Sequence, residues 1–342
     1  MSESGYLYAG LGGDTGEGYV ALAGLFRSKG GVEPWQRIDA AIDPLPEART
    51  IAVDPRRPGR VLIGTQAGIW RSDDHGETWR KTAAPRPALA VWSLAVHPHR
   101  PDTIYAGYEP CAIWRSEDGG ETWRDLGVAV TFPEVTMKPA PQVKRVIDIA
   151  VDPSRPDTIY AAIEVGGVIR SRDGGASWEG VSEGLYVNDD ALDLHRIVAS
   201  PAHPGVVSTI GRIGLFRSRD GGAHWGTLSV PSAFPGRRPY CRELVVAPDD
   251  PHTLYLGTGP AFEADRGALF KSTDFGVNWW PVELGAPIRS TVFALAIDET
   301  RPKQIFCGIK NGDVFASHNG GESWTLNPLP GGARQLYALA AG

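Results

Sequence analysis

The sequence predicts an all-β protein: a seven-bladed β-propeller of four-stranded antiparallel blades, closed by pairing of the C-terminal strand in the N-terminal blade. Three observations support this fold. A phrase of Ser, Asp, Gly and Trp recurs with Trp-to-Trp spacings of 44 to 55 residues. A second phrase lies between the copies and reads as strand, Pro-rich turn and strand. The two chain ends supply complementary parts of one unit. A period of this size indicates one supersecondary unit per repeat.

The recurring phrase is clearest in residues 116–123, SEDGGETW, and reads as a tight turn that leads into a strand. Asp accepts hydrogen bonds from nearby backbone N–H groups, and Gly adopts positive φ without steric cost, so both favour turns. Thr and Trp fit the strand that follows. Further copies span residues 72–79, 171–178, 218–225, 272–279 and 317–324, and a worn copy spans 28–35. Because the worn copy has Gly30 in place of Asp, we expect it to lack the hydrogen bonds of this turn.

The second phrase completes the repeat unit. It is clearest as LAVHPHRPDTIYAG in residues 94–107 and IAVDPSRPDTIYAA in residues 149–162. With the two strands of the first phrase, it gives four short strands, a to d, which is the blade of a propeller. The chain begins with strand b, at residues 6–10, and ends with strand a, at residues 336–340. We therefore expect one domain, residues 1–342, whose closed ring leaves no inner edge open to aggregation.

Composition bounds the class of protein. The formal net charge of −6 argues against general nucleic-acid binding. Three cysteines, Cys111, Cys241 and Cys307, fit neither a disulfide framework nor a metal site. We expect no cofactor and no metal. The start, MSESGYLYAG, has no signal pattern and no apolar run reaches ~18 residues, so we expect a cytoplasmic protein without membrane partners. A chain trimmed of its export signal would look the same.

Loop lengths point to one face of the ring. The a–b and c–d connections keep a constant length. Length varies in the b–c connections at residues 10–24 and 258–267, and in the d–a connections at 127–145, 181–194 and 229–241. In an up-and-down blade these two kinds of connection open on the same face. Because function concentrates on such variable loops, we expect any site on this face, around the central channel.

The phrase S-x-D-x-G-x-T-W resembles the Asp-box, or BNR, repeat. Families that share it include sialidases, xyloglucan hydrolases, sortilin-type receptors and photosystem II assembly factors. DPSRPDTIYAA followed by an Asp box is most similar to the xyloglucanase and assembly-factor branches. The resemblance implies the propeller fold. Sialidases of this type carry an Arg-Ile-Pro segment, which does not occur here, so we do not expect sialidase activity.

The Asp-box carboxylates allow two interpretations. They resemble the acidic residues of a calcium-binding loop. They also suit a hairpin whose turn is stabilised by hydrogen bonds from its own side chains. Because repeated equivalent sites do not make one active site, we expect a structural role. The repeat tryptophans are expected to pack in the core or between blades.

The start of strand a offers better candidates for a site. Alignment of the blades on Ile51 places these residues in one ring: Arg49, Trp92, Ile147, His195, Arg242, Phe293 and Tyr337. Two residues earlier the ring reads Glu47, Ala90, Arg145, Asp193, Tyr240, Thr291 and Gln335. A packed barrel would use apolar residues at these positions, so we expect a ligand site. The predicted ligand-binding residues are Arg49, Trp92, Arg145, Arg196, Arg212, Arg242 and Tyr337.

Two chemistries fit this residue set. His195 can act as a base or an acid, Tyr240 can donate a proton, and Arg242 can clamp a carboxylate. That combination suits proton abstraction beside a carboxylate, as in polysaccharide lyases. Glu164 and Asp193 would instead offer the two carboxylates of a glycoside hydrolase.

Two classes of function therefore stay open. The first is a carbohydrate-active hydrolase or lyase, or another protein that binds a small anionic or oligosaccharide ligand in the channel. The second is a non-catalytic interaction or assembly-factor scaffold. It would grip a protein partner through Pro-rich loops at residues 132–142 and 232–240.

Overall fold

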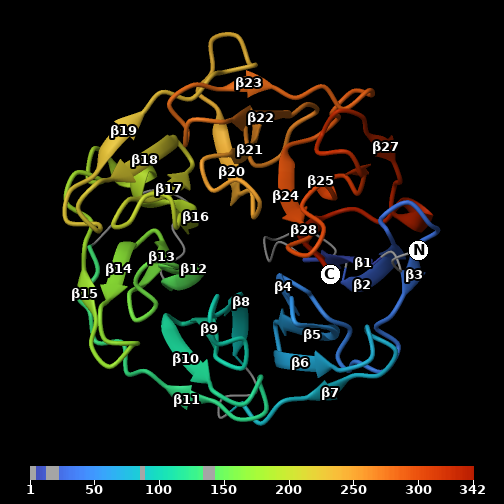
Figure 1. The fold of residues 1–342 in the computed structure, drawn as a ribbon, viewed down its shortest axis with the longest axis horizontal. Coiled ribbons are helices and arrows are strands. Elements are labelled where there is room, and N and C mark those ends of the chain that lie inside the picture. Colours follow the sequence, from blue (N-terminus) through green and yellow to red (C-terminus); the bar gives the residue numbers. More distant parts are fainter. Residues whose placement is uncertain (1–4, 13–22, 85–88, 134–142) are drawn as a thin grey trace.

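Seven four-stranded antiparallel sheets form a ring around a central axis (Figure 1). This computed structural model describes residues 5–12, 23–84, 89–133 and 143–342. Each sheet is one blade, with strand a at the centre and strand d at the rim (Figure 1). The seven-bladed, all-β fold predicted from the repeat is confirmed.

The first three blades contain the N-terminal third of the chain and its last strand. Blade 1 consists of β28 (Leu336–Ala341), β1 (Tyr6–Leu11), β2 (Gly24–Lys29) and β3 (Gln36–Arg37). Blade 2 consists of β4 (Thr50–Asp54), β5 (Arg57–Thr65), β6 (Gly68–Ser72) and β7 (Arg80–Lys81). Blade 3 consists of β8 (Ala90–Val96), β9 (Ile104–Glu109), β10 (Ala112–Ser116) and β11 (Arg124–Asp125).

The other four blades follow in chain order. Blade 4 consists of β12 (Arg145–Val151), β13 (Ile159–Glu164), β14 (Gly167–Ser171) and β15 (Glu179–Gly180). Blade 5 consists of β16 (Leu194–Ala199), β17 (Val207–Gly211), β18 (Gly214–Ser218) and β19 (Gly226–Leu228). Blade 6 consists of β20 (Tyr240–Val246), β21 (Leu254–Gly259), β22 (Ala268–Ser272) and β23 (Trp280–Pro281). Blade 7 consists of β24 (Val292–Ile297), β25 (Ile305–Ile309), β26 (Val314–Ser317) and β27 (Thr325–Leu326).

The described helices are two short 3₁₀ turns, η1 (Asp189–Leu192) and η2 (Pro330–Gly332). In the described part of the chain, no helix has the length and apolar character needed to cross a membrane.

Ring closure occurs where the sequence predicts it. Strand β28 pairs antiparallel with β1, with Leu7 opposite Ala341 and Ala9 opposite Leu339. The last described strand of the chain therefore becomes strand a of the N-terminal blade. The two ends of the ring are joined by a backbone ladder as well as by side-chain packing.

Apolar side chains between neighbouring blades form the core. One cluster joins Tyr105 and Ile113 of blade 3 to Val146 and Ile149 of blade 4. Close approach depends on a glycine in strand b: a Cβ on Gly107 would lie 2.6 Å from Cγ1 of Val146. The Gly that ends the repeated TIYAG phrase therefore lets the next blade pack against strand b.

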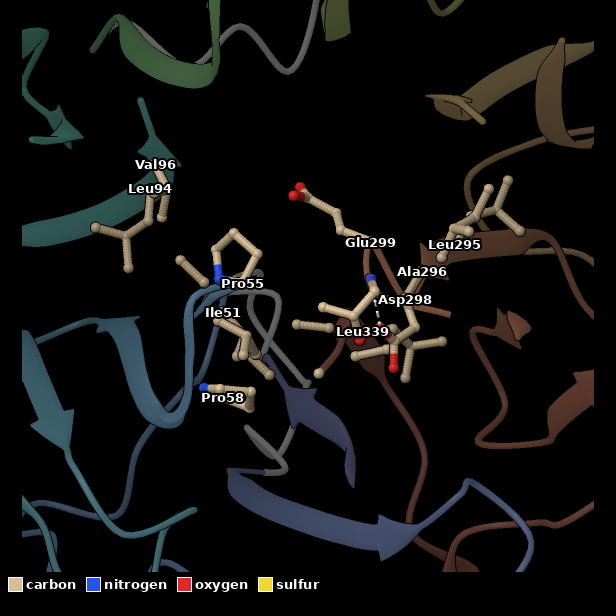
Figure 2. Close-up of a pocket in the computed structure, with 17 residues that line it drawn as sticks. Ile51, Pro55, Pro58, Leu94, Val96, Leu295, Ala296, Asp298, Glu299 and Leu339 are labelled. Atoms are coloured by element: carbon tan, nitrogen blue, oxygen red, sulfur yellow. Dashed lines mark hydrogen bonds between the residues drawn. The ribbon is translucent and has the colours of Figure 1, made fainter. Parts of the chain in front are cut away.

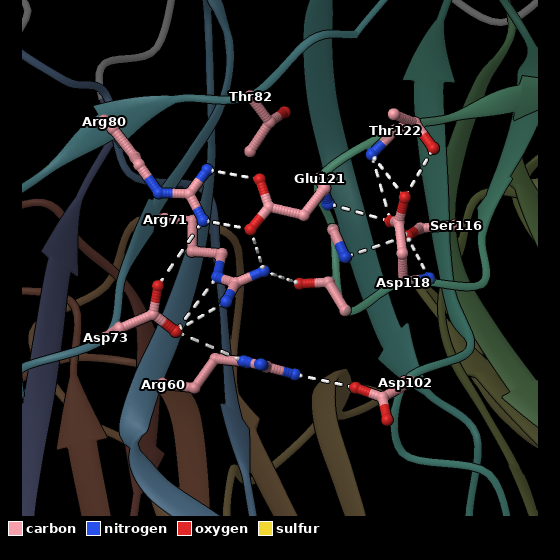
Figure 3. Close-up of polar contacts among 12 residues, drawn as sticks. Arg60, Arg71, Asp73, Arg80, Thr82, Asp102, Ser116, Asp118, Glu121 and Thr122 are labelled. Atoms are coloured by element: carbon pink, nitrogen blue, oxygen red, sulfur yellow. Dashed lines mark hydrogen bonds and ion pairs between the residues drawn. The ribbon is translucent and has the colours of Figure 1, made fainter.

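The Asp box closes the turn between strands c and d with its own side chains (Figure 3). Ser116 Oγ donates to Asp118 at 2.8 Å and accepts from the Gly120 N–H at 2.8 Å. Asp118 also accepts from the backbone N–H of Thr122 at 3.0 Å. In the worn copy, Ser28 Oγ donates instead to the carbonyl of Glu33. The expected loss of the Asp-box hydrogen bonds in that copy is confirmed.

The same turn also contacts the previous blade. An arginine directly before the box serine reaches the carbonyl three residues after the serine of the next box. We call these contacts the arginine latches; they join Arg27 to His75, Arg71 to Gly119, Arg115 to Gly174, Arg170 to Gly221 and Arg217 to Phe275. Lys271 and Ala316 occupy the arginine position in blades 6 and 7. At the seam between blades 7 and 1, Asn327 donates to the Gly31 carbonyl at 3.0 Å.

Candidate functional site

The predicted ring of residues coincides with irregularities in the innermost strand. In six blades the register between strands a and b shifts at the ring position. The residues at these shifts are Trp92, Ile147, His195, Arg242, Phe293 and Tyr337. Arg49, the seventh, directly precedes β4. A bulge leaves its residue out of the ladder and re-aims the side chain, which explains how one ring escapes the usual alternation of faces.

Contacts between blades that are not neighbours place these side chains near the axis. The rings of Trp92 in blade 3 and Tyr337 in blade 1 have centroids 6.0 Å apart, although blade 2 lies between those blades. Arg242 in blade 6 lies 5.2 Å from the centroid of Tyr337, past blade 7. The ring residues therefore meet at the centre, on the face that carries the b–c and d–a connections. We call this face the insertion face.

Aromatic rings form an arc around this end of the axis. Tyr337 is followed by Phe293 at 5.2 Å and then by Phe262 at 5.5 Å, centroid to centroid. Phe262 comes next to Tyr240 at 6.3 Å, which lies 4.8 Å from His195. Phe262 belongs to the long b–c connection of blade 6. The sequence marked that connection as an insertion but gave no signal for this residue.

Cationic side chains lie over Trp92 and over the arc. The guanidinium carbons of Arg49 and Arg145 are 4.1 and 4.2 Å from the centroid of Trp92. Arg242 lies 4.3 Å from Phe293. Cation–π attraction of this kind is worth about 2 kcal/mol or more where water is excluded, so it offsets part of the cost of burying these charges.

His195 is held in a defined orientation. Its Nδ1 lies 2.6 Å from the carbonyl oxygen of Cys241, so Nδ1 carries the proton and donates it to that carbonyl. Nε2 then faces the Tyr240 hydroxyl at 3.2 Å and a carboxylate oxygen of Asp193 at 3.6 Å. Burial raises the pKa of Tyr240 well above its usual value, partly offset by Arg242, so the phenol stays protonated. The geometry makes Nε2 a proton acceptor with a phenol donor beside it.

A second carboxyl group shares this environment. Glu164, at the end of β13, lies 2.9 Å from Nε of Arg145. Burial raises the pKa of Glu164; Arg145 opposes the rise and Asp193 adds to it. The structure thus brings His195, Tyr240 and Asp193 into contact, and the charges of Asp193 and His195 act on Glu164.

The predicted arginines differ in their partners. Arg49 pairs with Glu47, and Arg145 also contacts Glu109 at 3.4 Å. Arg242, by contrast, forms no ion pair with any described carboxylate, although its side chain is only 4% exposed. Its Nη1 is buried and has no hydrogen-bond partner among the described residues. Nε of Arg49 also lacks a hydrogen-bond partner among the described residues, but Arg49 has the carboxylate of Glu47 beside it. Arg242 is therefore the ring arginine that lacks a carboxylate partner in the described part of the chain.

Arg196 and Arg212 lie outside this arrangement. Arg196 makes a two-pronged contact with Glu243, at 2.5 and 2.8 Å, and lies 3.5 Å from Asp148. Burial raises the pKa of Asp148 to about 6, with Arg196 opposing the rise. Arg212 is half exposed and lies 3.6 Å from Asp190. The guanidinium of Arg196 is thus already occupied by carboxylates, and neither residue joins the ring.

Comparison with known proteins agrees with the fold. Residues 70–81 match the model of the BNR/Asp-box repeat. The chain is a seven-bladed β-propeller that contains the Asp-box repeat. No curated protein matches the sequence.

Solved structures of similar fold include GH74 enzymes and YCF48. The GH74 xyloglucanase from Xanthomonas campestris is 18% identical with a TM-score of 0.66, over 95% of this chain and 56% of that chain. The GH74 enzyme of Niastella koreensis is 16% identical with a TM-score of 0.65, over 82% of this chain and 45% of that chain. YCF48 bound to D1 peptide is 16% identical with a TM-score of 0.54, over 81% and 79%. This chain spans about half the length of the GH74 structures. At these identities the likeness shows the fold alone.

Proposed function

We propose that the insertion face binds a small ligand that carries a carboxylate, such as an acidic sugar, with Arg242 as the anion contact. The observation that carries this proposal is the buried, unpartnered Nη1 of Arg242. An isolated charge is costly to bury, and the nearby Phe293 and Tyr337 rings offset only part of that cost. A bound carboxylate would supply the missing acceptor and the missing counter-charge.

Proton transfer beside that carboxylate is the chemistry that these neighbours favour. Nε2 of His195 accepts a proton, and the Tyr240 hydroxyl donates one within hydrogen-bond reach. Arg242 would hold the carboxylate and stabilise negative charge on the adjacent carbon. We infer a lyase-type proton abstraction as the best-supported reaction of this site.

A glycoside hydrolase is the other enzymatic possibility. The raised pKa of Glu164 is what a general acid requires, and Asp193 would act as the second carboxylate. The structural likeness to GH74 enzymes, one of them titled a xyloglucanase, keeps this reading open. Product analysis separates the two reactions: a lyase leaves a new double bond that absorbs ultraviolet light, whereas a hydrolase adds water and leaves none.

Calorimetry with uronic-acid oligosaccharides and their neutral counterparts tests the ligand class. Arg242→Met keeps an apolar stem over Phe293 and Tyr337 but removes the charge, so it should weaken binding of the acidic oligosaccharides by about 1.5–3 kcal/mol. Arg212→Met is the matched control, because Arg212 is half exposed and lies outside the ring. The proposal fails if no acidic sugar binds the unmodified protein, or if both variants bind it equally.

A protein-binding scaffold is the second candidate function. A structure of comparable length supports it: the alignment covers 79% of the YCF48 structure, which is titled as bound to a peptide. The loop that leads into β20 is also suited to contact a partner. Phe234 anchors it in the core at 3% exposure, while Arg237 and Arg238 are exposed. The other predicted loop lies mostly at residues 134–142, outside the described residues.

Replacement of both exposed arginines tests this alternative. Arg237→Ser with Arg238→Ser should abolish capture of an acidic protein partner and leave acidic-sugar binding at Arg242 intact. Loss of sugar binding in this double variant, with no effect on any protein partner, would instead assign the loop to the sugar site.

A further inference from the structure

A cavity lies at the opposite end of the axis, on the face formed by the a–b and c–d turns, which we call the turn face (Figure 2). Its volume is about 280 Å³, close to the ~300 Å³ at which ligand pockets begin. Four neighbouring inner strands supply its walls: β24, β28, β4 and β8. It is therefore separate from the ring of charged and aromatic residues on the insertion face.

Most of the side chains that line this cavity are aliphatic. Side chains from opposite sides include Ile51, Leu94, Val96, Leu295 and Leu339. Leu94 and Val96 are only half-buried, so apolar surface remains accessible within the ring. A ligand for this place needs a hydrocarbon portion, because apolar surface removed from water contributes roughly 25 cal/mol per Å².

One carboxylate reaches into this apolar space. Glu299 follows β24, and its side chain extends towards Leu94 and Val96 on the opposite wall (Figure 2). Its two acidic neighbours already have partners: Asp298 pairs with Arg301 at 2.6 Å and Asp54 with Arg57 at 3.0 Å. Glu299 itself forms no ion pair with any described residue. Glu299 is exposed to solvent at the mouth of the cavity. The protein around it still raises its pKa by partial desolvation, and Asp298 and Asp54 raise the pKa further.

The repeat itself marks Glu299 as an exception. Glu299 is the second residue after the last apolar residue of strand a. In blades 2 to 6 the same position is a proline: Pro55, Pro98, Pro153, Pro201 and Pro248. Proline suits a tight turn because its φ is already fixed. Blade 7 has the ionisable side chain of Glu299 at this position, next to the cavity, in place of proline. Turn chemistry does not explain this replacement, whereas a ligand contact does.

We propose that this turn-face cavity is a binding site for a primary alkylamine, with Glu299 pairing with the ammonium group and the aliphatic walls holding the hydrocarbon chain. The occupant must combine a cation with an apolar body, since the lining residues other than Asp298, Glu299 and Thr300 are apolar. An anionic ligand would meet Glu299 beside Asp298 and Asp54. A neutral alcohol of the same length would gain only the apolar contact.

Titration of the full-length protein with n-hexylamine, n-hexanol and hexanoate, followed by calorimetry, tests the site. We expect hexylamine to bind at least tenfold more tightly than hexanol, with no binding of hexanoate. Glu299→Gln should weaken hexylamine binding about tenfold, and Glu299→Pro, which gives blade 7 the residue of the other blades, should do the same. Glu322→Gln, an exposed glutamate in the c–d turn of blade 7, is the matched control and should bind as the unmodified protein does.

A cavity-filling variant locates the binding. Val96→Phe should reduce hexylamine affinity, whereas Arg242→Met, at the other end of the axis, should leave it unchanged. Thermal melting of every variant shows that the ring is intact. The proposal is overturned if hexylamine does not bind, if Glu299→Gln binds it equally well, or if hexanol binds as tightly. None of these outcomes bears on the carboxylate site of the insertion face.

Discussion

The guanidinium of Arg71 in blade 2 donates a hydrogen bond to the backbone carbonyl of Gly119 in blade 3, with 2.7 Å between Nη1 and the oxygen (Figure 3). Gly119 has a φ of 73°, a conformation that the Asp-box turn holds in place. The turn therefore shapes its own hairpin and also aims a carbonyl at the previous blade. The Asp box joins blades as well as strands.

Loss of this latch should destabilise the ring. Arg71→Met removes a charged donor that is 5% exposed and leaves the Gly119 carbonyl without it. It also removes the ion pairs of Arg71 with the half-exposed Asp73 and Glu121, which add little, so we expect the free energy of unfolding to fall by about 1.5–3 kcal/mol. Urea denaturation measures the change. Arg80→Met is the control, because its ion pair with Glu121 is about half exposed and such pairs are worth roughly 0–1 kcal/mol. Equal effects of the two substitutions would contradict the latch.

The Asp-box carboxylate should matter for stability through its accepted hydrogen bonds. Asp118→Ala removes the acceptor for the Thr122 N–H and should cost about 0.5–2 kcal/mol, by analogy with lost helix caps. Asp118→Asn should cost much less, because Asn319 already serves one box, accepting from the Ser323 N–H at 3.0 Å. Thermal melting at neutral pH compares the two variants. Binding of any ligand on the insertion face should be unchanged in both.

Low pH should remove the contribution that the Asp118 carboxylate makes to stability. Partial burial opposes ionisation of Asp118, but hydrogen bonds from Thr122 and Ser116 outweigh it and lower the pKa to about 2. A carboxyl whose pKa is lower in the folded state stabilises the fold above its unfolded pKa, about 3.9, and loses that contribution as pH falls through about 2. Denaturation at a series of pH values should therefore show a shallower acid dependence for Asp118→Asn. An unchanged dependence would mean that the folded carboxyl titrates as in the unfolded chain.

The buried charge at Arg242 should reduce stability. Arg242→Met replaces an unpaired, 4% exposed cation by an apolar side chain over the same aromatic rings. Replacing buried charges by apolar groups can stabilise a protein by about 1–4 kcal/mol. Because the lost cation–π attraction offsets part of that gain, we expect the free energy of unfolding to rise by about 1 kcal/mol. Chemical denaturation without ligand measures it. A marked loss of stability would mean that Arg242 has a structural partner.

Ring closure should be essential. Deletion of residues 334–342 removes β28, which pairs with β1 from Leu7 opposite Ala341 to Leu11 opposite Leu336. The open ring should melt at a much lower temperature, because the apolar contacts of β28 are lost and an edge of β1 is exposed. A synthetic peptide of residues 334–342, added in excess, should recover part of the loss. A melting temperature equal to that of the intact protein would refute ring closure by the pairing of β28 with β1.

The repeat predicted the blades, the closure and the ring positions, because each copy shows the same residue types at the same spacing. It did not predict the bulges, since a register shift depends on pairing across strands and leaves no fixed residue type at Trp92 or His195. The repeat also did not predict which arginines form ion pairs. Arg196 and Arg242 both lie in strand a, yet only Arg196 contacts described carboxylates. Glu47, two residues before Arg49, was the visible signal of one such pair. Glu299 was visible too, as a departure from the repeated proline.

The bulges allow the recognition surface of this fold to be changed by a few substitutions. A residue outside the ladder makes no demand on the strand opposite, so its identity can change while each sheet keeps its pairing. Six blades offer one such position each at the axis, and the strand start at Arg49 offers a seventh. Point substitutions at these positions could then convert one recognition surface into another on an unaltered frame. A library that varies only these seven residues should yield folded proteins at high frequency.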